Sequence, residues 1–510
     1  MTPRLARHGL LWLTVIAGVY LVTRTWHLTA LPMFFDEALH ILWGDRWHGP
    51  HGLPRALWGG KLLGVAAIGV ATRLGPDDPL RAARLAVVLI GLVTLFSSFW
   101  LGRRVGGLPG GVFTAVLVTA CPFLLFHDRM ALVDPFVTAF AALALVATVG
   151  LCDHPSLARG ALLGLALAAA GAAKVLGVAA LAPSLVGVVL LAGRDGRAWR
   201  ALGVAWGLAG LLLWVPVRGF VGGGGEVGEK AAFFAEDRWT LAHENLVQLG
   251  AWLWVYLTPT ILALGLLATA LALARRRRLE ILLVFAWAFP LVAFVLGVRV
   301  WYPRYVLFAA VPFLALVGGA LGEAWSRARG RAGRASLVLV VAGSLVPGAL
   351  FLQALLQDPS SVRLPQLDRW QYVEGWPSGY GWAEAHEFLL DEVAGEALPH
   401  RVATEPYHWT LKASFLGQRG VTVKAFDVWK SSELVRAADW TGGGGGWLVV
   451  SKPVVPDEAL ELTHLAGFTK PGRQGSVHVY RLRSSHREPR VPPRRGGDEA
   501  PGDPPSEGPE

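Results

Sequence analysis

The sequence predicts a polytopic, mainly α-helical membrane protein with a water-soluble α/β domain towards its C-terminal end. Of its 510 residues, 53% are hydrophobic and 16% are charged, whereas a soluble domain carries roughly 25% charged residues. The apolar residues fall in runs long enough to cross a hydrocarbon core about 30 Å thick. These runs stop near Gln357, after which the composition becomes that of a soluble protein.

About eleven apolar segments reach or approach the roughly 20 residues that a spanning helix requires. The division within 160–192 is the least defined, because Lys174 interrupts one long run. The first segment also fits a cleaved signal peptide, but no clear small-x-small cleavage site follows it, which favours an uncleaved span. The predicted spans lie near 9–23, 83–101, 109–126, 132–151, 160–173, 175–192, 200–218, 249–274, 279–298, 304–323 and 335–356.

Arginine clusters between these spans predict the orientation. Cytoplasmic loops carry an excess of Lys and Arg, and with the N-terminus in the cytoplasm every cluster falls on that side. The amphipathic stretch 59–74 must then lie on the outer surface as a helix, since another crossing would reverse all later loops. The clusters are Arg4 and Arg7, Arg103 and Arg104, Arg194 to Arg200, Arg275 to Arg278, and Arg327 to Arg334.

This threading divides the chain into a membrane module, an outer domain and a tail. The membrane module covers 1–357, with a first outer loop at 24–82 and a second at 219–248. Residues 358–483 are long enough for one extracytoplasmic α/β domain. Residues 484–510 are rich in Pro, Gly and charge without periodicity, which predicts a disordered tail. Within the outer domain, strands are expected at 420–428, 446–450 and 476–482, and helices at 383–394 and 457–465.

The charge and cysteine content exclude several classes of protein. The net charge is +10, but it lies in short clusters between apolar runs rather than on one soluble face, which argues against a nucleic-acid-binding protein. The two cysteines, Cys121 and Cys152, are predicted near opposite membrane faces, so we expect no disulfide between them. Neither has the spacing of a zinc site.

The most informative polar feature is the adjacent pair Asp36 and Glu37, which follows the first span. Ionised groups at a bilayer surface are usually anchors or chemistry, and anchoring is typical of Lys and Arg rather than of acids. Other unusual polar residues also fall at predicted outer span ends. They are His40, Lys61, His127, Asp128, Arg129, Asp134, Lys174, His243, Arg299, Tyr302 and Arg304.

A pocket at the outer leaflet that gathers these residues suits one kind of chemistry. A carboxylate serves as a general base towards a hydroxyl nucleophile, and Lys and Arg bind a phosphate and stabilise the charge that grows on it. A lipid phosphate arrives from the bilayer, where Lys61, Arg299 and Arg304 are expected to meet it. Plainer interpretations stay open, namely a helix cap for the acids, interfacial snorkelling for the cations, a pair between Asp134 and Arg129, and a loop position for His243.

The segment FFDEALH (34–40) resembles the polytopic glycosyltransferases of the GT-C type, specifically glycosyltransferase family 39, which includes protein O-mannosyltransferases and lipid A aminoarabinose transferases. The likeness extends to HDRMALVDPF (127–136), GAAKVLGVAAL (171–181), RYVLFAAVPFLAL (304–316) and residues 371–389, and so covers about 1–485. The chain departs from the family where many members carry Lys/His-Pro-Pro, because it reads Gly60-Lys61-Leu62-Leu63.

The resemblance implies inverting transfer of a sugar from a polyprenyl-phosphate-linked donor to an acceptor hydroxyl of a protein, lipid or glycan. It implies that Asp36 is the base and that Glu37 orients the acceptor, while Lys61, Arg299 and Arg304 bind the donor phosphate. Asp134 would position a pocket base or help to hold a divalent ion. No cofactor is required; if a metal is used, Asp36 and Asp134 are the candidate ligands. Further substrate-binding candidates are Arg129, Lys174, His243, Tyr302 and His40.

These expectations place the protein in the plasma membrane, with membrane lipid around it, a cytoplasmic N-terminus and an extracytoplasmic C-terminal domain. The main alternative function is a transporter or lipid flippase. That class predicts charges along a path near the bilayer midplane and inverted repeats, and the sequence shows neither. A receptor-like or assembly protein is a third alternative. The sugar, the acceptor and the prenyl length are not fixed by the sequence.

Overall fold

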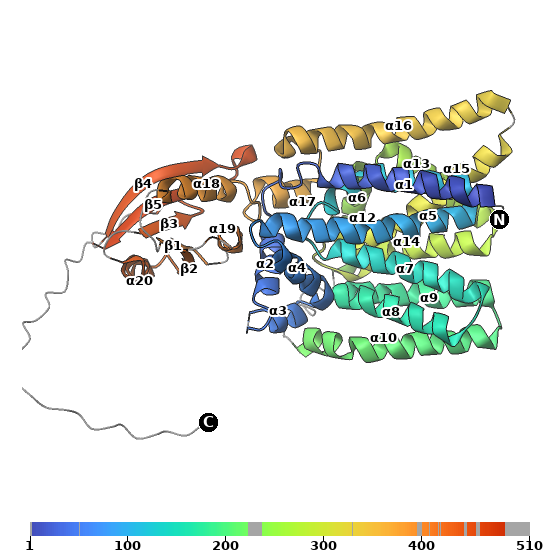
Figure 1. The fold of residues 1–510 in the computed structure, drawn as a ribbon, viewed down its shortest axis with the longest axis horizontal. Helices are drawn as coiled ribbons and strands as arrows, with labels where there is room; N and C mark the ends of the chain where they lie inside the picture. The colour runs from blue at the N-terminus through green and yellow to red at the C-terminus, as the bar shows by residue number, and fades with distance from the viewer. Residues whose placement is uncertain are drawn as a thin grey trace, which may run out of the picture.

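The computed structural model of the chain shows a helical module and, at the end of the module opposite the N-terminus, a domain built on a β-sheet (Figure 1). The structure describes residues 3–484 except 50, 223–236, 329, 395–399, 407, 417, 419, 443–445 and 455–459. The predicted tail beyond Ser484 and residues 223–236 of the predicted second outer loop therefore lie outside the described residues.

The helical module contains long apolar helices and short helices that connect them. Its elements are α1 (Pro3–Thr25), α2 (Phe35–Asp45), α3 (Leu53–Trp58), α4 (Leu62–Leu74), α5 (Pro79–Ala120), α6 (Pro122–His127), α7 (Asp134–Asp153), α8 (Leu157–Ala173), η1 (Val175–Ala180), α9 (Leu181–Gly187), η2 (Val188–Ala192), α10 (Gly196–Gly222), α12 (Arg238–Tyr256), α13 (Pro259–Arg275), α14 (Arg278–Gly297), η3 (Pro303–Ala309), α15 (Ala310–Arg327) and α16 (Gly330–Gln357).

Seven helical segments of the described chain are long and apolar enough to cross a membrane, and the bent pair α12–α13 gives an eighth. The 42-residue α5 is counted once, although the chain turns back at Gly106 and Gly107, whose backbone is not helical. A Cβ built on Gly110 would lie 2.5 Å from the Gly102 carbonyl oxygen, so the two halves of α5 form a hairpin. Counting both halves, together with the shorter apolar helices α1 and α8, accounts for the predicted spans.

One predicted span of the module is broken, and the predicted surface helix is present. The segment 249–274, predicted as one span, is broken, and α12 and α13 are bent by 113° at the break. Pro259 begins α13 and Thr258 has a φ of +63°, so the helix does not continue, because proline lacks the amide hydrogen that the preceding turn needs. The predicted surface helix corresponds to α4, whose 13 residues are too short to span.

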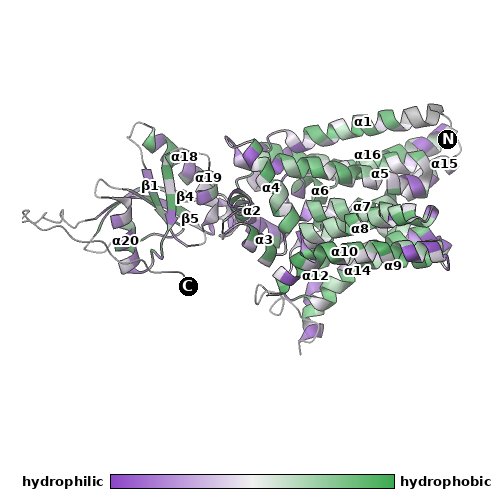
Figure 2. Cartoon of the chain, turned by 60° about the horizontal axis from the view of Figure 1, so that its bottom comes forward, coloured by the Kyte–Doolittle hydropathy of each residue, from purple (hydrophilic) through white to green (hydrophobic). Residues whose placement is uncertain are grey.

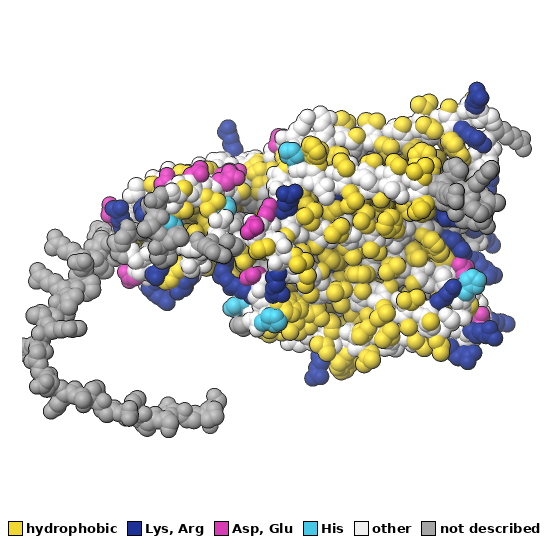
Figure 3. All heavy atoms as spheres, in the orientation of Figure 1, with side chains coloured by type: hydrophobic (Ala, Val, Ile, Leu, Met, Phe, Trp, Pro, Cys, Tyr) yellow, Lys and Arg dark blue, Asp and Glu magenta, His cyan; other side chains and the backbone are white. Residues whose placement is uncertain are grey.

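The outside of the module is apolar along the length of the helices. Figure 2 shows hydrophobic residues along the helices of the module, and Figure 3 shows hydrophobic side chains over its outer surface. Leu211 and Leu339 are 74% and 71% exposed. Lys and Arg side chains gather at the end of the module that carries the N-terminus (Figure 3). An apolar belt with charges confined to the ends is what a lipid bilayer requires of a multi-pass protein.

The sheet domain follows α16 through a short connection that lies against the module. The connection holds η4 (Pro359–Ser361), α17 (Gln366–Arg369) and η5 (Trp370–Glu374). The domain then contains α18 (Trp382–Val393), β1 (His400–Thr404), α19 (Trp409–Ser414), β2 (Val421–Ala425), α20 (Ser431–Thr441), β3 (Gly446–Val450), β4 (Leu460–Thr469), η6 (Pro471–Arg473) and β5 (Ser476–Ser484).

The strands form one mixed sheet in the order β2-β1-β3-β5-β4. Strand β1 is parallel to β2 and β3, while β5 is antiparallel to β3 and β4. Helices α18 and α19 pack on one face and α20 on the other. The helix predicted at 457–465 is wrong, because the described part of this segment begins β4. Pairing with β5 determines its structure, and such tertiary context overrides local propensity.

The sheet domain contacts the first loop of the module. Ala413 of α19 belongs to the same apolar cluster as Ala38 and Ile41 of α2. The amide nitrogen of Phe35, the first residue of α2, donates to the carbonyl oxygen of Pro377 at 3.0 Å. The helix that carries Asp36 and Glu37 is therefore held between the membrane module and the sheet domain.

Candidate active site

Asp36 lies in the first turn of α2 and keeps part of its carboxylate accessible. Arg304 Nη2 donates to Asp36 Oδ2 at 2.8 Å, and the Asp36 side chain is 22% exposed. Burial alone raises the pKa of this carboxyl, but the charges of Lys61 and Arg304 outweigh it and hold the pKa well below its usual range. Asp36 is therefore an ionised, partly open carboxylate beside two cations.

Glu37 is the opposite case, because it is fully buried and its oxygens are all engaged. Arg84 Nε and Nη2 donate to its two oxygens at 2.8 and 2.7 Å. The backbone nitrogens of Phe34 and Ala131 donate to it at 2.9 and 2.6 Å. These contacts fix the start of α2 against α5 and the 128–133 connection, so the geometry gives Glu37 a supporting position rather than contact with an acceptor.

His40 orients Lys61. The His40 Nδ1 lies 3.0 Å from the Ala131 carbonyl oxygen, and its Nε2 lies 3.2 Å from Lys61 Nζ. Burial, and then the charge of Lys61, lower the pKa of His40 to about 3. The imidazole is therefore neutral, with Nδ1–H donating to the carbonyl and Nε2 accepting from the lysine. Since His40 is 1% exposed, it has almost no surface of its own at the site and acts on it through Lys61.

A second carboxylate and a third cation complete the cluster. Lys174 Nζ lies 2.7 Å from Asp134 Oδ1 and 3.7 Å from the centre of the Tyr305 ring. Arg304 Nε lies 3.9 Å from Asp134 Oδ2. The Arg304 Nη1 also donates to Gln371 Oε1 at 2.5 Å and to the Tyr372 hydroxyl at 3.2 Å.

The charges of this cluster do not balance. With His40 neutral, three cations face two carboxylates, an arrangement that favours an anionic ligand. The residues come from the start of α2, the residue before α4, the start of α7, the end of α8 and η3, which are far apart in the sequence. We call this set the cation cluster; it consists of Asp36, Lys61, Asp134, Lys174 and Arg304.

The donor set does not favour a divalent metal. Asp36 and Asp134, the two carboxylates that the sequence offers, each pair with a cation. In the part of the chain that the structure describes, no group of three or more His, Cys, Asp or Glu side chains is placed to hold a metal ion.

Several predicted site residues lie outside the cation cluster. Arg129 donates to the carbonyl oxygens of Thr23, Arg24 and His27 at 2.8 to 3.1 Å, so it caps the C-terminal end of α1. Arg299 pairs at 3.4 Å with Asp237 on the surface, and His243 is exposed on α12. Tyr302 does belong to the surroundings, since its ring lies 4.5 Å from the Arg304 guanidinium carbon.

The structure adds residues that the sequence did not single out. Arg84 binds Glu37, while Gln371 and Tyr372 hold Arg304. A charge such as Arg84 inside a predicted span is a signal in itself. No sequence feature connects residues 371 and 372 with Arg304, because the contact depends on how the connection after α16 packs against the membrane module.

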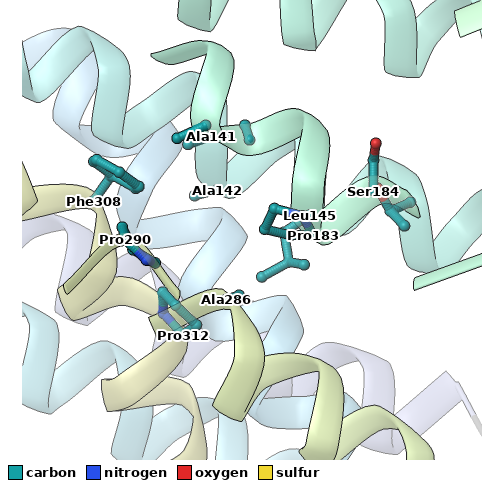
Figure 4. A pocket seen from close by; sticks show the side chains of 12 residues that line it. Ala141, Ala142, Leu145, Pro183, Ser184, Ala286, Pro290, Phe308 and Pro312 are labelled. Atoms are coloured by element: carbon teal, nitrogen blue, oxygen red, sulfur yellow. The ribbon is translucent and has the colours of Figure 1, made fainter. Parts of the chain in front are cut away.

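An apolar pocket lies deeper in the module between helices that carry the cation cluster. Ala142 is about 12 Å along α7 from Asp134, at 1.5 Å per residue, and Phe308 and Arg304 share η3. Figure 4 shows the labelled side chains around this pocket. They are Ala141, Ala142, Leu145, Pro183, Ser184, Ala286, Pro290, Phe308 and Pro312.

Comparisons with known proteins identify the fold of the chain. No protein-family model matches the chain, and no curated protein matches it in sequence. ArnT from Cupriavidus metallidurans bound to undecaprenyl phosphate matches with a TM-score of 0.54 and 16% identity, over 92% of this chain and 97% of ArnT. The oligosaccharyltransferase of Archaeoglobus fulgidus matches with a TM-score of 0.54 and 12% identity, over 86% of this chain and 68% of that protein. The predicted fold class is confirmed: the chain has the fold of the GT-C membrane glycosyltransferases.

Proposed function

We propose that this protein is a membrane glycosyltransferase that moves a sugar from a polyprenyl-phosphate donor to an acceptor hydroxyl, with Asp36 as the base. The observation that carries the proposal is the cation cluster. It brings a partly exposed carboxylate within 2.8 Å of an arginine, next to two lysines and above an apolar pocket. Family 39 is the member of the GT-C group that we propose for it, on the motifs around Asp36, Asp134 and Arg304.

The proposed reaction uses the two halves of the cluster differently. Lys61, Lys174 and Arg304 bind the donor phosphate and stabilise its negative charge as it leaves. The Asp36 carboxylate takes the proton of the acceptor hydroxyl. The acceptor oxygen then bonds to the anomeric carbon from the opposite side, the bond from that carbon to the phosphate oxygen breaks, and prenyl phosphate departs with the electron pair.

Arg304 connects substrate binding to activation of the base. In the structure it pairs with Asp36, which lowers the pKa of this carboxyl and weakens it as a base. A bound phosphate competes for the same guanidinium. Once Arg304 turns to the phosphate, the pKa of Asp36 rises and the carboxylate becomes a better proton acceptor.

The lipid part of the donor follows from the surroundings and from the fold. A prenyl chain needs an apolar path, and the pocket between α7, α9, α14 and α15 lies about 12 Å from the cation cluster along α7. ArnT shares this fold and binds undecaprenyl phosphate, which makes undecaprenyl phosphate the carrier that we propose here. In contrast with the path that a flippase requires, the charges gather at the ends of helices rather than along them.

Turnover of defined donors tests the proposal. The full chain in lipid nanodiscs is supplied with undecaprenyl-phosphate-mannose or -arabinofuranose and with membrane extract as the acceptor source, and release of undecaprenyl phosphate is measured. Release should fall by about 10²–10⁴-fold in Asp36→Asn. The matched control is Asp237→Asn, which removes an exposed carboxylate that also pairs with an arginine and should leave the rate unchanged. A normal rate in Asp36→Asn excludes Asp36 as the base.

A further inference from the structure

Lys470, at the end of β4, is a buried lysine without a carboxylate partner in the described structure. Its side chain is 3% exposed, and Nζ donates to the carbonyl oxygens of Gly375, Trp376 and Ser378 at 3.1, 3.5 and 2.8 Å. A buried charge that is satisfied only by neutral groups is costly. Burial accordingly lowers the pKa of Lys470 to about 8. The ammonium is the donor that these three carbonyls share, and an apolar side chain at position 470 would leave them without it.

The turn that Lys470 holds is in contact with the start of α2. The Pro377 carbonyl oxygen accepts from the Phe35 nitrogen at 3.0 Å. The Phe35 ring meets the Trp376 ring edge-on, with 5.1 Å between the centroids. At Gly379, a Cβ would lie 2.3 Å from the Met33 carbonyl oxygen, so the two backbones are in direct contact. Phe35 is the residue before Asp36.

The same connection also determines where Arg304 lies. Gln371 and Tyr372 accept from its Nη1, and the Tyr372 ring packs against Phe34 with 4.6 Å between centroids. Residues 371–378 thus contact Arg304 directly and reach Asp36 through its neighbours Phe34 and Phe35. Lys470, which follows β4, binds carbonyl oxygens at the C-terminal end of this segment and so links it to the sheet.

We propose that Lys470 is a positioning residue for the transfer reaction, which acts through the 375–378 turn on the first turn of α2. This inference rests on the proposed function for its kinetic readout but has a second readout that does not. Loss of the Lys470 ammonium frees three carbonyls, loosens the Pro377 contact and lets Asp36 move relative to Arg304. Misplacement of a catalytic group by about 1 Å costs up to 10²-fold in rate.

Position 35 allows the backbone contact to be removed separately. Phe35 is the first residue of α2, and Phe34 before it is extended, with φ −74° and ψ 152°. Proline is tolerated at the first helical position and requires such an extended residue before it. Phe35→Pro therefore removes the hydrogen bond to Pro377 together with the ring. Phe35→Ala, which loses the ring and keeps the amide, is its matched control.

The experiment combines amide hydrogen exchange with kinetics on the full chain in nanodiscs. In Lys470→Met, exchange of the segment 33–38 should speed up about tenfold or more, and kcat with undecaprenyl-phosphate-mannose or -arabinofuranose should fall about tenfold to a hundredfold while KM changes less than about threefold. Lys470→Arg should restore part of both. Lys430→Met, at an exposed lysine of the same domain, should change neither.

A double variant separates positioning from general damage. Because both changes act on one contact, Lys470→Met added to Phe35→Pro should lower kcat little further, whereas independent effects multiply. Unchanged exchange at 33–38 in Lys470→Met, or multiplied effects on kcat, overturns the inference.

If Lys470→Met does not fold, the comparison of Phe35→Pro with Phe35→Ala is the test, and equal kcat values for the two variants overturn the inference. If the wild type transfers no sugar, the proposed function fails, while faster exchange in Lys470→Met still supports the mechanical link.

Discussion

Asp36 and Glu37 are neighbours in the chain but belong to two different regions of the molecule. Successive residues of a helix point about 100° apart. As a result, Asp36 meets the cation cluster and keeps 22% of its side chain exposed, while Glu37 points into the interior and binds Arg84 with no exposure. One carboxylate is open to a substrate and the other supports the backbone that carries it. An acidic pair in a sequence therefore does not imply two catalytic acids.

The largest expected effect comes from the Glu37 region and concerns folding. Glu37→Gln leaves the buried Arg84 without its counter-charge, and breaking a buried pair from one side costs about 3–5 kcal/mol. We expect a large drop in the thermal unfolding midpoint in detergent and a smaller one for Asp36→Asn, because Asp36 is 22% exposed and its partner Arg304 keeps Asp134 and Gln371. Asp153→Asn is the control, because its pair with Arg104 is 32–40% exposed and should contribute about 1 kcal/mol or less. Equal midpoints for Glu37→Gln and the wild type would contradict the supporting role.

The second prediction tests whether the cation cluster binds the phosphate, as Asp36's surroundings in this comparison imply. Charge-assisted hydrogen bonds contribute about 1.5–3 kcal/mol each, so Lys174→Met and Arg304→Met should each weaken binding of undecaprenyl phosphate about tenfold to a hundredfold. Native mass spectrometry of nanodiscs with added lipid measures this. Arg299→Met is the matched control, since Arg299 is 46% exposed and pairs with Asp237. Comparable losses in all three variants would mean that the cluster is not the phosphate site.

A third carboxylate, Asp368, offers a contrast in pH dependence. It is fully buried and accepts from the Tyr256 hydroxyl, and its second oxygen has no partner in the described structure. Burial raises the pKa of Asp368 to about 7. In contrast, neighbouring cations hold the pKa of Asp36 low. The folded state therefore retains this proton longer than the unfolded state, so stability is greatest at acid pH and is lost as the pH rises through about 7.

Asp368→Asn, which resembles the protonated form, should therefore raise the unfolding midpoint at pH 8 and leave it nearly unchanged at pH 4. The difference between wild type and variant should appear between about pH 4 and 7. A constant difference across this range would show that Asp368 is ionised throughout.

The smallest effect is expected at His40. His40→Phe removes the acceptor of Lys61 and the donor to Ala131, and a hydrogen bond contributes about 0.5–1.5 kcal/mol net. The affinity for undecaprenyl phosphate should fall about twofold to tenfold. Because the pKa of His40 is about 3, this residue should add no pH dependence to binding between pH 5 and 8. A step in binding near pH 6.5 that disappears in His40→Phe would contradict the neutral assignment.

The sequence was sufficient to predict the membrane fold, because apolar runs and arginine clusters are local signals of the bilayer. It was also sufficient to place Asp36, Lys61, Asp134, Lys174 and Arg304 at helix ends. It did not show that Glu37 points inwards, because that depends on the partner Arg84 and on the capped turn at Phe34. The sequence predicts Arg129 near the substrate, but its side chain caps the end of α1 instead. A buried arginine needs acceptors for its N–H groups, and the carbonyl oxygens at this helix end supply them.

The contacts of residues 371 and 372 could not be predicted from the sequence for the same reason. Gln371 and Tyr372 meet Arg304 across more than sixty positions of the chain, and only the packing of the connection against the module brings them together. The error at β4 is similar, because residues 460–464 pair with residues of β5 that lie 16 to 24 positions further along the chain.

The most direct test of the account is a cryo-EM map of the full chain in nanodiscs with undecaprenyl phosphate bound. The account predicts phosphate density within about 3 Å of the Lys174 and Arg304 nitrogens, with the prenyl chain continuing towards Ala142 and Pro312. It also predicts that Arg304 has released Asp36. Phosphate density at Arg299 or Arg129, with the pair between Arg304 and Asp36 intact, would contradict it.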